Sequence, residues 1–520
     1  MKHLRFLFLL SVLLPMAMAA QEVDYEAGVT VNAGSEELAP YFISALKGGT
    51  VTQQYSTLLH GTLRHTMDTT RRLSWGAGAQ LWAGWASSTD YYNHEAGAMI
   101  GRHPARAWVQ ELYVEGKYRA VYAVIGQKER GTPWLNGRLS SGDLVMSGNA
   151  RPGYGVRGGL IDFQNIPLTK GWVQIKGELG YYRFGDGDWL ENHYNHRNHF
   201  INTGYWMNYK NIYFRTKPDE HLVLTIGLQA ACQFGGTVKE YADGVMYNTY
   251  NMDANAKAFF KALIPGSGGS GAADANYYEG NHLGSWDVAL QYNLKNGASL
   301  RAYHQHLWED GSGIGFKNGF DGLWGLEYNA GRRSPLSGVV VEYLDLTNQS
   351  GPLHFNPHDY TNSDRPAGSP VTGEATGSDD YYNNYGYNGY HNRGLSIGSP
   401  MVLSPLYHTD GYMRYYDNRM RGVHIAFEGT VADGLSYRAR YAWRKSWGNI
   451  FMPRPEAATM SSWSLEGQYD VKSVDGLRLN LQLALDRGDL ASGNPRYPET
   501  KTNFGVLLGV AYHGNFSLRK

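Results

Sequence analysis

The sequence has almost no cysteine and no excess of charge of either sign. Cys232 is the single cysteine among 520 residues, so the chain cannot form an internal disulfide. Its neighbours Leu228, Ala230 and Phe234 indicate an ordinary apolar position. The 47 basic and 47 acidic residues balance, so no global field attracts an anionic polymer. We therefore expect no disulfide framework and no nucleic-acid partner.

Long apolar stretches are also missing, except at the start of the chain. Beyond residue 20, no run is long enough to form a membrane helix. Residues 1–20 combine a basic start, an apolar core and an Ala-Met-Ala site at 17–19, which is typical of a cleaved signal peptide. These features predict an exported protein whose mature part, residues 21–520, forms one domain.

Tyrosine, tryptophan and glycine are abundant, with 39, 14 and 65 residues respectively. Outer-membrane barrels share this bias, because aromatic side chains form girdles at the membrane interfaces and glycine suits tight turns and crowded strands. The bias alone does not assign a fold. It favours a β-rich protein of the outer membrane over an ordinary soluble one.

Strict alternation of apolar and polar residues is the clearest structural signal. In the segment 172–182, Val173, Ile175 and Leu179 fall on one face while Lys176 and Glu178 fall on the other. Such a ribbon has one apolar and one polar face. A soluble sandwich turns the polar face to water, whereas a transmembrane barrel turns the apolar face to lipid and the polar face to its lumen.

The connections between the strand-like segments favour the barrel. Short and long connections alternate along the whole chain, as a barrel with both termini in the periplasm requires, provided that the weak segment 153–162 counts as a strand. The expected strands are 24–33, 51–66, 72–86, 105–117, 119–128, 153–162, 171–184, 204–216, 221–234, 283–296, 298–308, 322–330, 337–347, 412–430, 434–447, 461–471, 477–487 and 501–514. We predict an all-β fold, a single transmembrane antiparallel β-barrel of about 18 strands with long extracellular loops. A secreted protein with two or more sandwiches is the alternative, but no linker divides the chain.

A first candidate site lies in the loop 130–152, which is rich in small residues, amides and arginines. Its candidate residues are Trp134, Arg138, Asn149 and Arg151. Such a loop could fold into the barrel and hydrogen-bond to the wall, and the same groups could bind sugar hydroxyls and carboxylates. We favour packing as its main role.

A second candidate is the tyrosine loop, residues 379–393. Its candidate residues are Tyr381, Tyr382, Tyr385, Tyr387, Tyr390, Asn384 and Arg393. Aromatic faces beside amide donors are what a carbohydrate surface needs, because sugar C–H faces stack on rings and hydroxyls need hydrogen-bond partners. The alternative is a loop that packs on itself above the barrel.

The remaining motifs predict no catalytic centre, no metal and no cofactor. His193, His196 and His199 lack a defined ligand geometry and a nearby cysteine, so we interpret them as solvated loop residues. No serine, histidine or acid stands in a recognisable nucleophile motif, and we expect no enzyme. The helical pattern at 251–264 could cap or plug the pore.

Several loop motifs resemble the Wzi capsule-assembly family, and they keep their order through nearly all of the mature chain. They include S-S-G-D-L-V-M-S-G-N-A-R-P (140–152), T-K-G-W-V-Q-I-K-G (169–177), A-A-C-Q-F-G-G (230–236), E-G-N-H-L-G-S-W (279–286) and I-G-S-P-M-V-L-S-P (397–405). The resemblance implies an 18-stranded barrel in the outer membrane that acts as a surface lectin and tethers capsular polysaccharide. No binding residue is carried over from it.

We therefore expect a non-enzymatic barrel whose partners are a capsular polysaccharide or exopolysaccharide, outer-membrane lipid and lipopolysaccharide. Other components of a polysaccharide export apparatus could be further partners. A porin-like channel for small solutes or saccharides is the alternative, because a barrel of this size encloses a wide lumen. The long loops at 235–282 and 348–411 are expected to fold over or into the barrel and to leave little conductance.

Overall fold

The computed structural model describes the greater part of the chain. The described residues are 21–93, 96–193, 200–242, 245–264, 280–350, 354–356, 374–376, 379–384, 386–490 and 499–518. The predicted signal peptide, residues 1–20, lies outside them. No helix within these ranges is long and apolar enough to cross a membrane.

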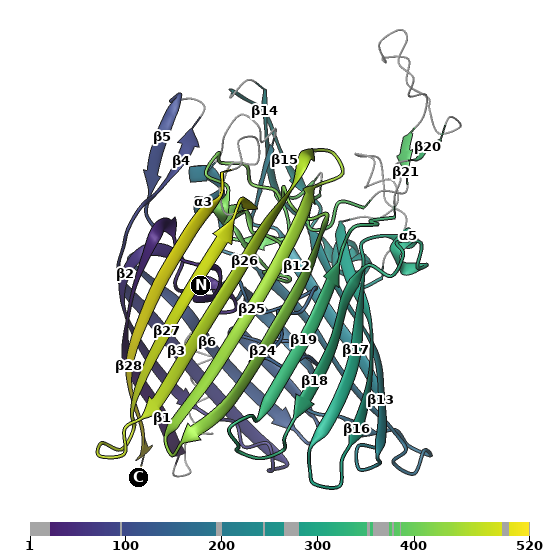
Figure 1. The fold of residues 1–520 in the computed structure, drawn as a ribbon. Helices are drawn as coiled ribbons and strands as arrows, with labels where there is room; N and C mark the ends of the chain where they lie inside the picture. The colour runs from purple at the N-terminus through teal and green to yellow at the C-terminus, as the bar shows by residue number, and fades with distance from the viewer. Residues whose placement is uncertain are drawn as a thin grey trace, which may run out of the picture.

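Tilted antiparallel strands form one continuous wall (Figure 1). Within the described residues this wall has 18 full strands, and the two-residue β9 (Gln164–Asn165) extends the line of β8 along β10. The strands are β1 (Gln21–Leu38), β2 (Gln53–His65), β3 (Leu73–Ala86), β6 (Ala107–Tyr118), β7 (Val121–Gln127), β8 (Tyr154–Leu160), β10 (Val173–Arg183), β12 (Trp206–Thr216), β13 (Leu222–Phe234), β16 (Asn281–Asn293), β17 (Ser299–Trp308), β18 (Gly322–Asn329), β19 (Gly338–Asp345), β24 (Met420–Ala432), β25 (Leu435–Gly448), β26 (Pro453–Asp470), β27 (Leu477–Gly488) and β28 (Lys501–Leu518).

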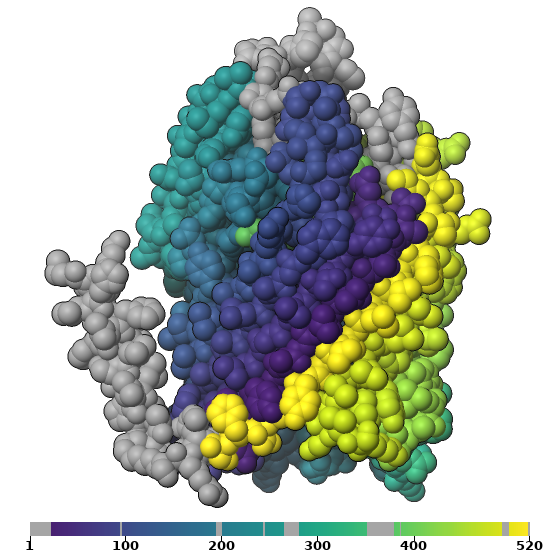
Figure 2. Space-filling view, turned by 90° about the vertical axis from the view of Figure 1, so that its left-hand side faces the viewer, coloured from purple at the N-terminus to yellow at the C-terminus, as the bar shows by residue number. Residues whose placement is uncertain are grey.

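The first and last strands close the wall. In β1, Tyr25 lies opposite Leu63 of β2 on one side and opposite Gly514 of β28 on the other. Figure 2 shows these two ends of the chain side by side along the surface. Closure leaves no unpaired edge in the wall, which satisfies the backbone groups that a membrane would leave without partners. The predicted antiparallel barrel is therefore confirmed.

Side chains alternate across the wall as the sequence pattern predicted. In β27, Leu481 is 45% exposed on the outer face, whereas its neighbour Gln482 is fully buried inside. Leu81 and Trp85 of β3 are likewise exposed on the outer face. Arg440 and Arg444 of β25 are buried on the inner face. The outer face thus carries the apolar band that lipid contact requires.

The two ends of the barrel differ in the length of their connections (Figure 1). The end that carries the C-terminus has tight turns, and the opposite end carries the long connections and the protruding hairpins. The elements that do not belong to the wall are β4 (Thr89–Asn93), β5 (Ala98–Arg102), β11 (Phe200–Thr203), β14 (Gly236–Ala242), β15 (Val245–Met252), β20 (His354–Asn356), β21 (Glu374–Thr376), β22 (His391–Asn392), β23 (Leu395–Ser396), η4 (Pro405–Tyr407), α2 (Tyr41–Ser44), α3 (Gly187–His193), α4 (Ala256–Lys261) and α5 (Gly311–Ile314). Short and long connections alternate as expected except between β25 and β26, where residues 449–452 replace the predicted long connection 448–460.

Strand boundaries differ from the expected ones at two loops. The predicted strand 412–430 begins only at Met420, because Tyr415 turns inward and its hydroxyl donates to the carbonyl of Tyr390. The predicted strand 461–471 begins earlier, at Pro453. The first error arises because period-two patterning continues into a loop segment. The second arises because Pro453 and Pro455 argue against a strand in the sequence. The weak segment 153–162 is β8, as the alternation of connections predicted.

The expected helix at 251–264 is shorter and does not plug the pore. Asn255 caps α4 by accepting a hydrogen bond from the N–H of Ala258. Phe259 of α4 packs on Tyr181 and Trp206, which point outward because Tyr182 and Met207 beside them line the interior. The helix therefore lies on the outer surface of the wall near the long-loop end.

Candidate functional site

Three connecting segments fold back into the lumen and fill much of it. They are the N-terminal segment (residues 39–52), the crossing loop (128–153), and the tyrosine loop with its continuation (379–384 and 386–419). We call them together the plug. The plug holds the candidate site residues that the structure describes, so its contacts decide what these residues can do.

The N-terminal segment packs against the inner face of strands β24 to β27. The N–H of Tyr41 donates to Asp486 at 2.7 Å, and Gln482 donates to the carbonyl of Phe42 at 2.7 Å. Arg444 lies over the ring of Tyr41 at 4.0 Å. Inward polar residues of the wall thus hold a short apolar helix, α2, through its backbone and its aromatic faces.

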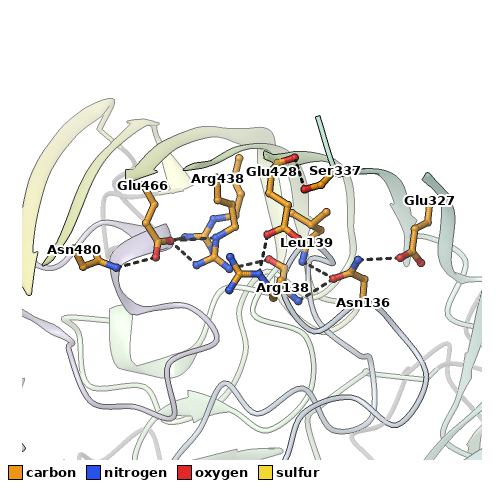
Figure 3. A network of polar contacts seen from close by, with 10 residues as sticks. Asn136, Arg138, Leu139, Glu327, Ser337, Glu428, Arg438, Glu466 and Asn480 are labelled. Carbon is orange, nitrogen blue, oxygen red and sulfur yellow. Dashed lines mark hydrogen bonds and ion pairs between the residues drawn. The ribbon is translucent and has the colours of Figure 1, made fainter. Parts of the chain in front are cut away.

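The crossing loop leaves the wall after β7 and reaches strands β18, β24 and β25, where Figure 3 shows its residues Asn136 and Arg138 among polar side chains of the wall. Arg138 donates to Glu428 of β24 at 2.7 Å, and the carbonyl of Arg138 accepts a bond from Arg438 of β25 at 3.0 Å. Asn136 donates to Glu327 of β18 at 2.9 Å. These bonds tie the predicted candidate Arg138 to the barrel wall. Its guanidinium pairs with the carboxylate of Glu428 rather than with a carboxylate of a ligand.

The centre of the crossing loop is buried, and polar side chains of the wall form hydrogen bonds with its polar groups. Gln229 of β13 donates to Asp143 at 2.9 Å, and the N–H of Leu144 donates to Gln305 of β17 at 2.7 Å. A buried loop would otherwise carry unsatisfied backbone groups, which are costly. The prediction of an infolded loop that bonds to the wall is confirmed.

The tyrosine loop is not an exposed surface, contrary to the expectation of a carbohydrate platform. Its described candidate tyrosines are each at most 2% exposed: Tyr381, Tyr382, Tyr387 and Tyr390. The hydroxyls of Tyr382 and Tyr390 donate to the carbonyls of Leu144 and Val145 at 2.6 and 2.8 Å. The loop packs on the crossing loop because each phenol finds a backbone acceptor there. Tyr385 lies outside the described residues.

Three more candidates also serve the interior. Asn149 accepts from the N–H of Leu46 and donates to the carbonyl of Ser396, both at 3.0 Å, so it joins all three plug segments. Trp134 packs edge-on against Tyr303 of β17. Asn384, which is half-buried, donates to the wall residue Asn281 at 3.1 Å.

The plug leaves a cavity of about 770 Å³ against the wall formed by β2, β3 and β6. Ion pairs line it, with Arg64 bonded to Glu111 and Lys128 bonded to Glu115, both at 2.6 Å. The tryptophan Trp82 adds an aromatic surface. The mixture of paired charges and aromatic rings suits polar solutes and water rather than an apolar ligand.

A second cavity of about 370 Å³ continues toward the short-turn end. It shares Glu115, Lys128 and Arg130 with the first and reaches Ile161. Arg130 pairs with Glu178 of β10 at 2.7 Å. Burial opposes the charge of Arg130, but Glu178 still raises its pKa above the ordinary value. The two cavities together form a narrow, charge-lined space along one side of the lumen.

A smaller pocket of about 80 Å³ opens at the long-loop end, and we call it the outer pocket. Its lining comes from the N-terminal segment with the start of β2, the β4–β5 hairpin with the residues after it, α3, the crossing loop, and the tyrosine loop with its continuation: Gly49, Thr52, Gln53, Tyr91, Arg102, His103, Pro104, Ala105, Arg151, Trp189, His193, Asn392, Arg393, Leu395 and Leu406. Of the predicted candidates, Arg151 and Arg393 meet here. Arg151 also lines the 770 Å³ cavity, so it stands between the two spaces.

The architecture matches that of known outer-membrane proteins. Wzi of Escherichia coli, described as an outer membrane protein involved in group 1 capsule assembly and a carbohydrate binding β-barrel, has a TM-score of 0.51 to this chain. The match covers 93% of this chain and 83% of Wzi at 14% identity. The chain therefore shares the β-barrel fold of an outer membrane protein. At this identity the likeness concerns the fold, so it supports the resemblance to the Wzi family only at that level.

Two other solved structures match the chain with TM-scores below 0.5. OccAB2 of Acinetobacter baumannii covers 95% of this chain and 98% of its own chain at 10% identity, with a TM-score of 0.46. OccD3 of Pseudomonas aeruginosa matches 96% and 94% at 9% identity, with a TM-score of 0.43. No family model matches the chain, and no curated protein matches it.

The histidine motif places only its first member in the described structure. His193 ends α3 and stacks on Trp189 at 4.1 Å, and burial lowers its pKa to about 4. This partly buried, stacked ring differs from the solvated loop histidine that the sequence predicted. His196 and His199 lie outside the described residues. Elsewhere in the described part of the barrel, no group of histidine, cysteine and acidic side chains is arranged to hold a metal ion.

Sequence reasoning missed most of the outer pocket. Arg102 and Trp189 come from different loops, and neither stands in a motif that suggests binding. The one available signal was the pair Arg102-His103, which is basic and precedes a proline. Only the folded plug shows that this pair faces Arg151 and Arg393 across one pocket.

Proposed function

We propose that this barrel binds and tethers a capsular or other surface polysaccharide at its extracellular face, without a catalytic step, cofactor or metal. The observation that carries the proposal is the plug. A diffusion channel needs an open lumen, whereas here three connecting segments cross the lumen and bond to one another and to the wall. A barrel filled in this way is better suited to present a fixed outer surface.

The rigidity of the plug supports a binding role. Asn149 joins the three segments, and the phenols of Tyr382 and Tyr390 hold the tyrosine loop on the crossing loop. Loops fixed by buried hydrogen bonds lose little entropy when a ligand binds to their outer side. The outer pocket, at the long-loop end, is the place where this fixed surface is hollowed.

The shared fold with Wzi adds to the proposal. Wzi is described as a carbohydrate binding barrel involved in capsule assembly, and we extend that role to this chain as a proposal. Outer-leaflet lipid and lipopolysaccharide would surround the wall, and components of a polysaccharide export apparatus would be further partners. A long polymer with repeated units could then be held by many weak contacts on many barrels.

A channel for small solutes is the second candidate, and one observation favours it. The cavities of about 770 and 370 Å³ share lining residues, and the outer pocket meets the larger cavity at Arg151. A charge-lined passage along one side of the plug could carry small polar solutes if Arg151 moved. The plug makes this the weaker candidate.

Two measurements on the same preparation separate the candidates. Polysaccharide extracted from the surface of cells that express the protein is tested for binding to the folded barrel, with heat-denatured protein as the control. The same barrel is inserted into planar bilayers for single-channel recording. Binding with little steady conductance is the expected result. Large, steady currents without binding would contradict the proposal and favour the channel.

A further inference from the structure

The outer pocket has an unbalanced charge. Its lining contains three arginines, Arg102, Arg151 and Arg393, and two histidines, and its described lining includes no aspartate or glutamate. This contrasts with Arg64, Lys128 and Arg130 of the lumen cavities, each of which has a carboxylate within ion-pair distance. A pocket lined by cations without matching acids attracts an anionic group.

Arg151 is the least compensated of the three arginines. Within the described residues no carboxylate lies within ion-pair distance of it, and its buried Nε has no hydrogen-bond acceptor. Its guanidinium lies over the ring of Trp108 at 4.7 Å. Burial and the nearby charge of Arg393 lower the pKa of Arg151 to about 10. An anion beside Arg151 would supply the missing acceptor and offset this cost.

The acids near Arg393 do not remove the imbalance. Asp188 pairs with Arg393 at 3.0 Å and is exposed to solvent on its other side. Asp186 is 1% exposed, and burial raises its pKa to about 7, so it carries only part of a charge at neutral pH. Neither acid lines the pocket. The carboxylate of Asp188 therefore pairs with Arg393 only, and Arg151 and Arg102 can still bind an anion.

The pocket also offers a free acceptor for a hydroxyl. Asn392 is 3% exposed, its Nδ2 donates to the carbonyl of Arg151 at 2.8 Å, and its buried Oδ1 has no donor. A buried acceptor and a buried donor in one pocket, both without partners, fit a ligand that carries an anionic group next to a hydroxyl. The carboxylate of a sugar acid has this combination.

The size of the pocket limits what enters it. About 80 Å³ accommodates a carboxylate with its adjoining carbon and a few water molecules, but not a chain of sugar rings. Trp189 has one face covered by His193, so it forms a wall of the pocket rather than an open stacking platform. The rest of a polymer would run over the surface outside, where His103 and Ala105 are exposed.

We propose that the outer pocket binds the carboxylate of an acidic sugar residue in a surface polysaccharide, with Arg151 and Arg102 as the anion-binding groups and Asn392 as the acceptor for a neighbouring hydroxyl. This inference rests on the proposed polysaccharide-binding function and names the chemistry that the polymer must carry. A phosphate on a surface glycan shares the anionic chemistry, and the experiment distinguishes the two sources.

The experiment compares two forms of one polymer. Polysaccharide extracted from cells that express the protein is used untreated and after chemical reduction of its carboxyl groups to alcohols. The folded wild-type barrel should bind the reduced polymer at least about tenfold more weakly, as expected for the loss of a charge-assisted contact. Free glucuronate should compete with the untreated polymer, and inorganic phosphate and glucose should not.

Variants locate the contact in the pocket. Arg151→Gln and Arg102→Gln should each weaken binding of the untreated polymer and leave binding of the reduced polymer unchanged. Arg102 lies at the end of the β4–β5 hairpin, so its variant tests the proposal even if Arg151→Gln disturbs the packing on Trp108. Arg106→Gln is the matched control, because Arg106 is exposed near the same hairpin and does not line the pocket.

Each outcome has a separate meaning. Equal binding of both polymer forms, or a polymer without sugar acids that binds well, would overturn the carboxylate inference and leave the proposed function standing. Competition by phosphate but not by glucuronate would replace the carboxylate with a phosphate. Loss of binding in Arg106→Gln equal to that in Arg102→Gln would place the contact outside the pocket. Absence of binding to either form would overturn the proposed function itself.

Discussion

The hydroxyl of Tyr382 donates a hydrogen bond of 2.6 Å to the carbonyl of Leu144, and both residues are fully buried. The bond joins two loops that leave the barrel wall at different strands, β7 and β19. The same hydroxyl accepts a bond from the N–H of Ser399 at 3.1 Å. One phenol thus satisfies two backbone groups that would otherwise be buried without partners.

The first prediction concerns this phenol. Tyr382→Phe should cost about 1–3 kcal/mol of stability because it leaves the carbonyl of Leu144 and the N–H of Ser399 unpaired. Tyr382→Ala should cost more, about 3–5 kcal/mol, since it also opens a cavity. Thermal unfolding of the detergent-solubilised barrel measures both. If Tyr382→Ala unfolds like the wild type, the tyrosine is not a packing residue.

A shortened crossing loop should open the lumen. Replacing residues 131–150 with a short Gly/Ser linker removes the bonds of Asn136, Arg138 and Asn149 to the wall and to the other plug segments. We expect steady single-channel currents well above those of the wild type in planar bilayers. Deletion of 365–378, of which the structure describes only β21, serves as the control and should leave the conductance low. Equal currents in the two variants would contradict the blocking role of the crossing loop.

The orientation in the membrane can be tested with epitope tags. A tag at Gly97, in the turn between β4 and β5, should bind antibody on intact cells because this hairpin protrudes at the long-loop end. A tag at Asp475, in the short turn between β26 and β27, should bind only after permeabilisation. Labelling at Asp475 on cells verified to be intact would show that the barrel has the opposite orientation in the membrane.

Much of the fold could be predicted because alternation is a local property. Leu481 and Gln482 differ in polarity, and that difference alone assigns one to lipid and the other to the lumen. The weak strand β8 was found from the alternation of short and long connections, which is a global constraint. Neither signal depends on knowing which residues meet in space.

The site could not be predicted in the same way, because its contacts are long-range. An exposed sugar platform and a buried plug both need aromatic rings and amides, so the composition of the tyrosine loop fits either. The loop is buried because the carbonyls of Leu144 and Val145 lie within hydrogen-bond distance of the hydroxyls of Tyr382 and Tyr390. That depends on the crossing loop, more than 200 residues earlier.

A charge on the lipid face should destabilise the barrel more than one on the lumen face. Leu481→Arg places a cation in the outer apolar band and should cost about 2–4 kcal/mol near the middle of the membrane. Asn480→Arg, on the inner face beside Glu466, is the matched control and should cost less. Urea unfolding from lipid vesicles measures both. A larger cost for Asn480→Arg would contradict the assignment of the two faces.

Acid should loosen the tyrosine loop through His391. Its Nε2 lies 3.1 and 3.0 Å from the carbonyls of Asn388 and Met413, and the N–H of Gly394 points to its Nδ1 at 3.3 Å. This arrangement fits a neutral ring with a proton on Nε2, because a second proton on Nδ1 would oppose the N–H of Gly394. Burial is the main cause that lowers the pKa of His391 to about 4, and the charge of His408 adds to it.

The sign of the effect follows from the direction of this shift. Between pH 6.5 and 4 the unfolded chain binds a proton at His391 that the folded barrel does not, so the stability falls as the pH falls. The loss from this one group should approach about 3 kcal/mol at pH 4. His391→Gln should be less stable than the wild type at pH 7.5 but should lose less stability on acidification. Melting temperatures measured from pH 7.5 to 4 test this, and parallel curves for the two proteins would show that His391 does not titrate in this range.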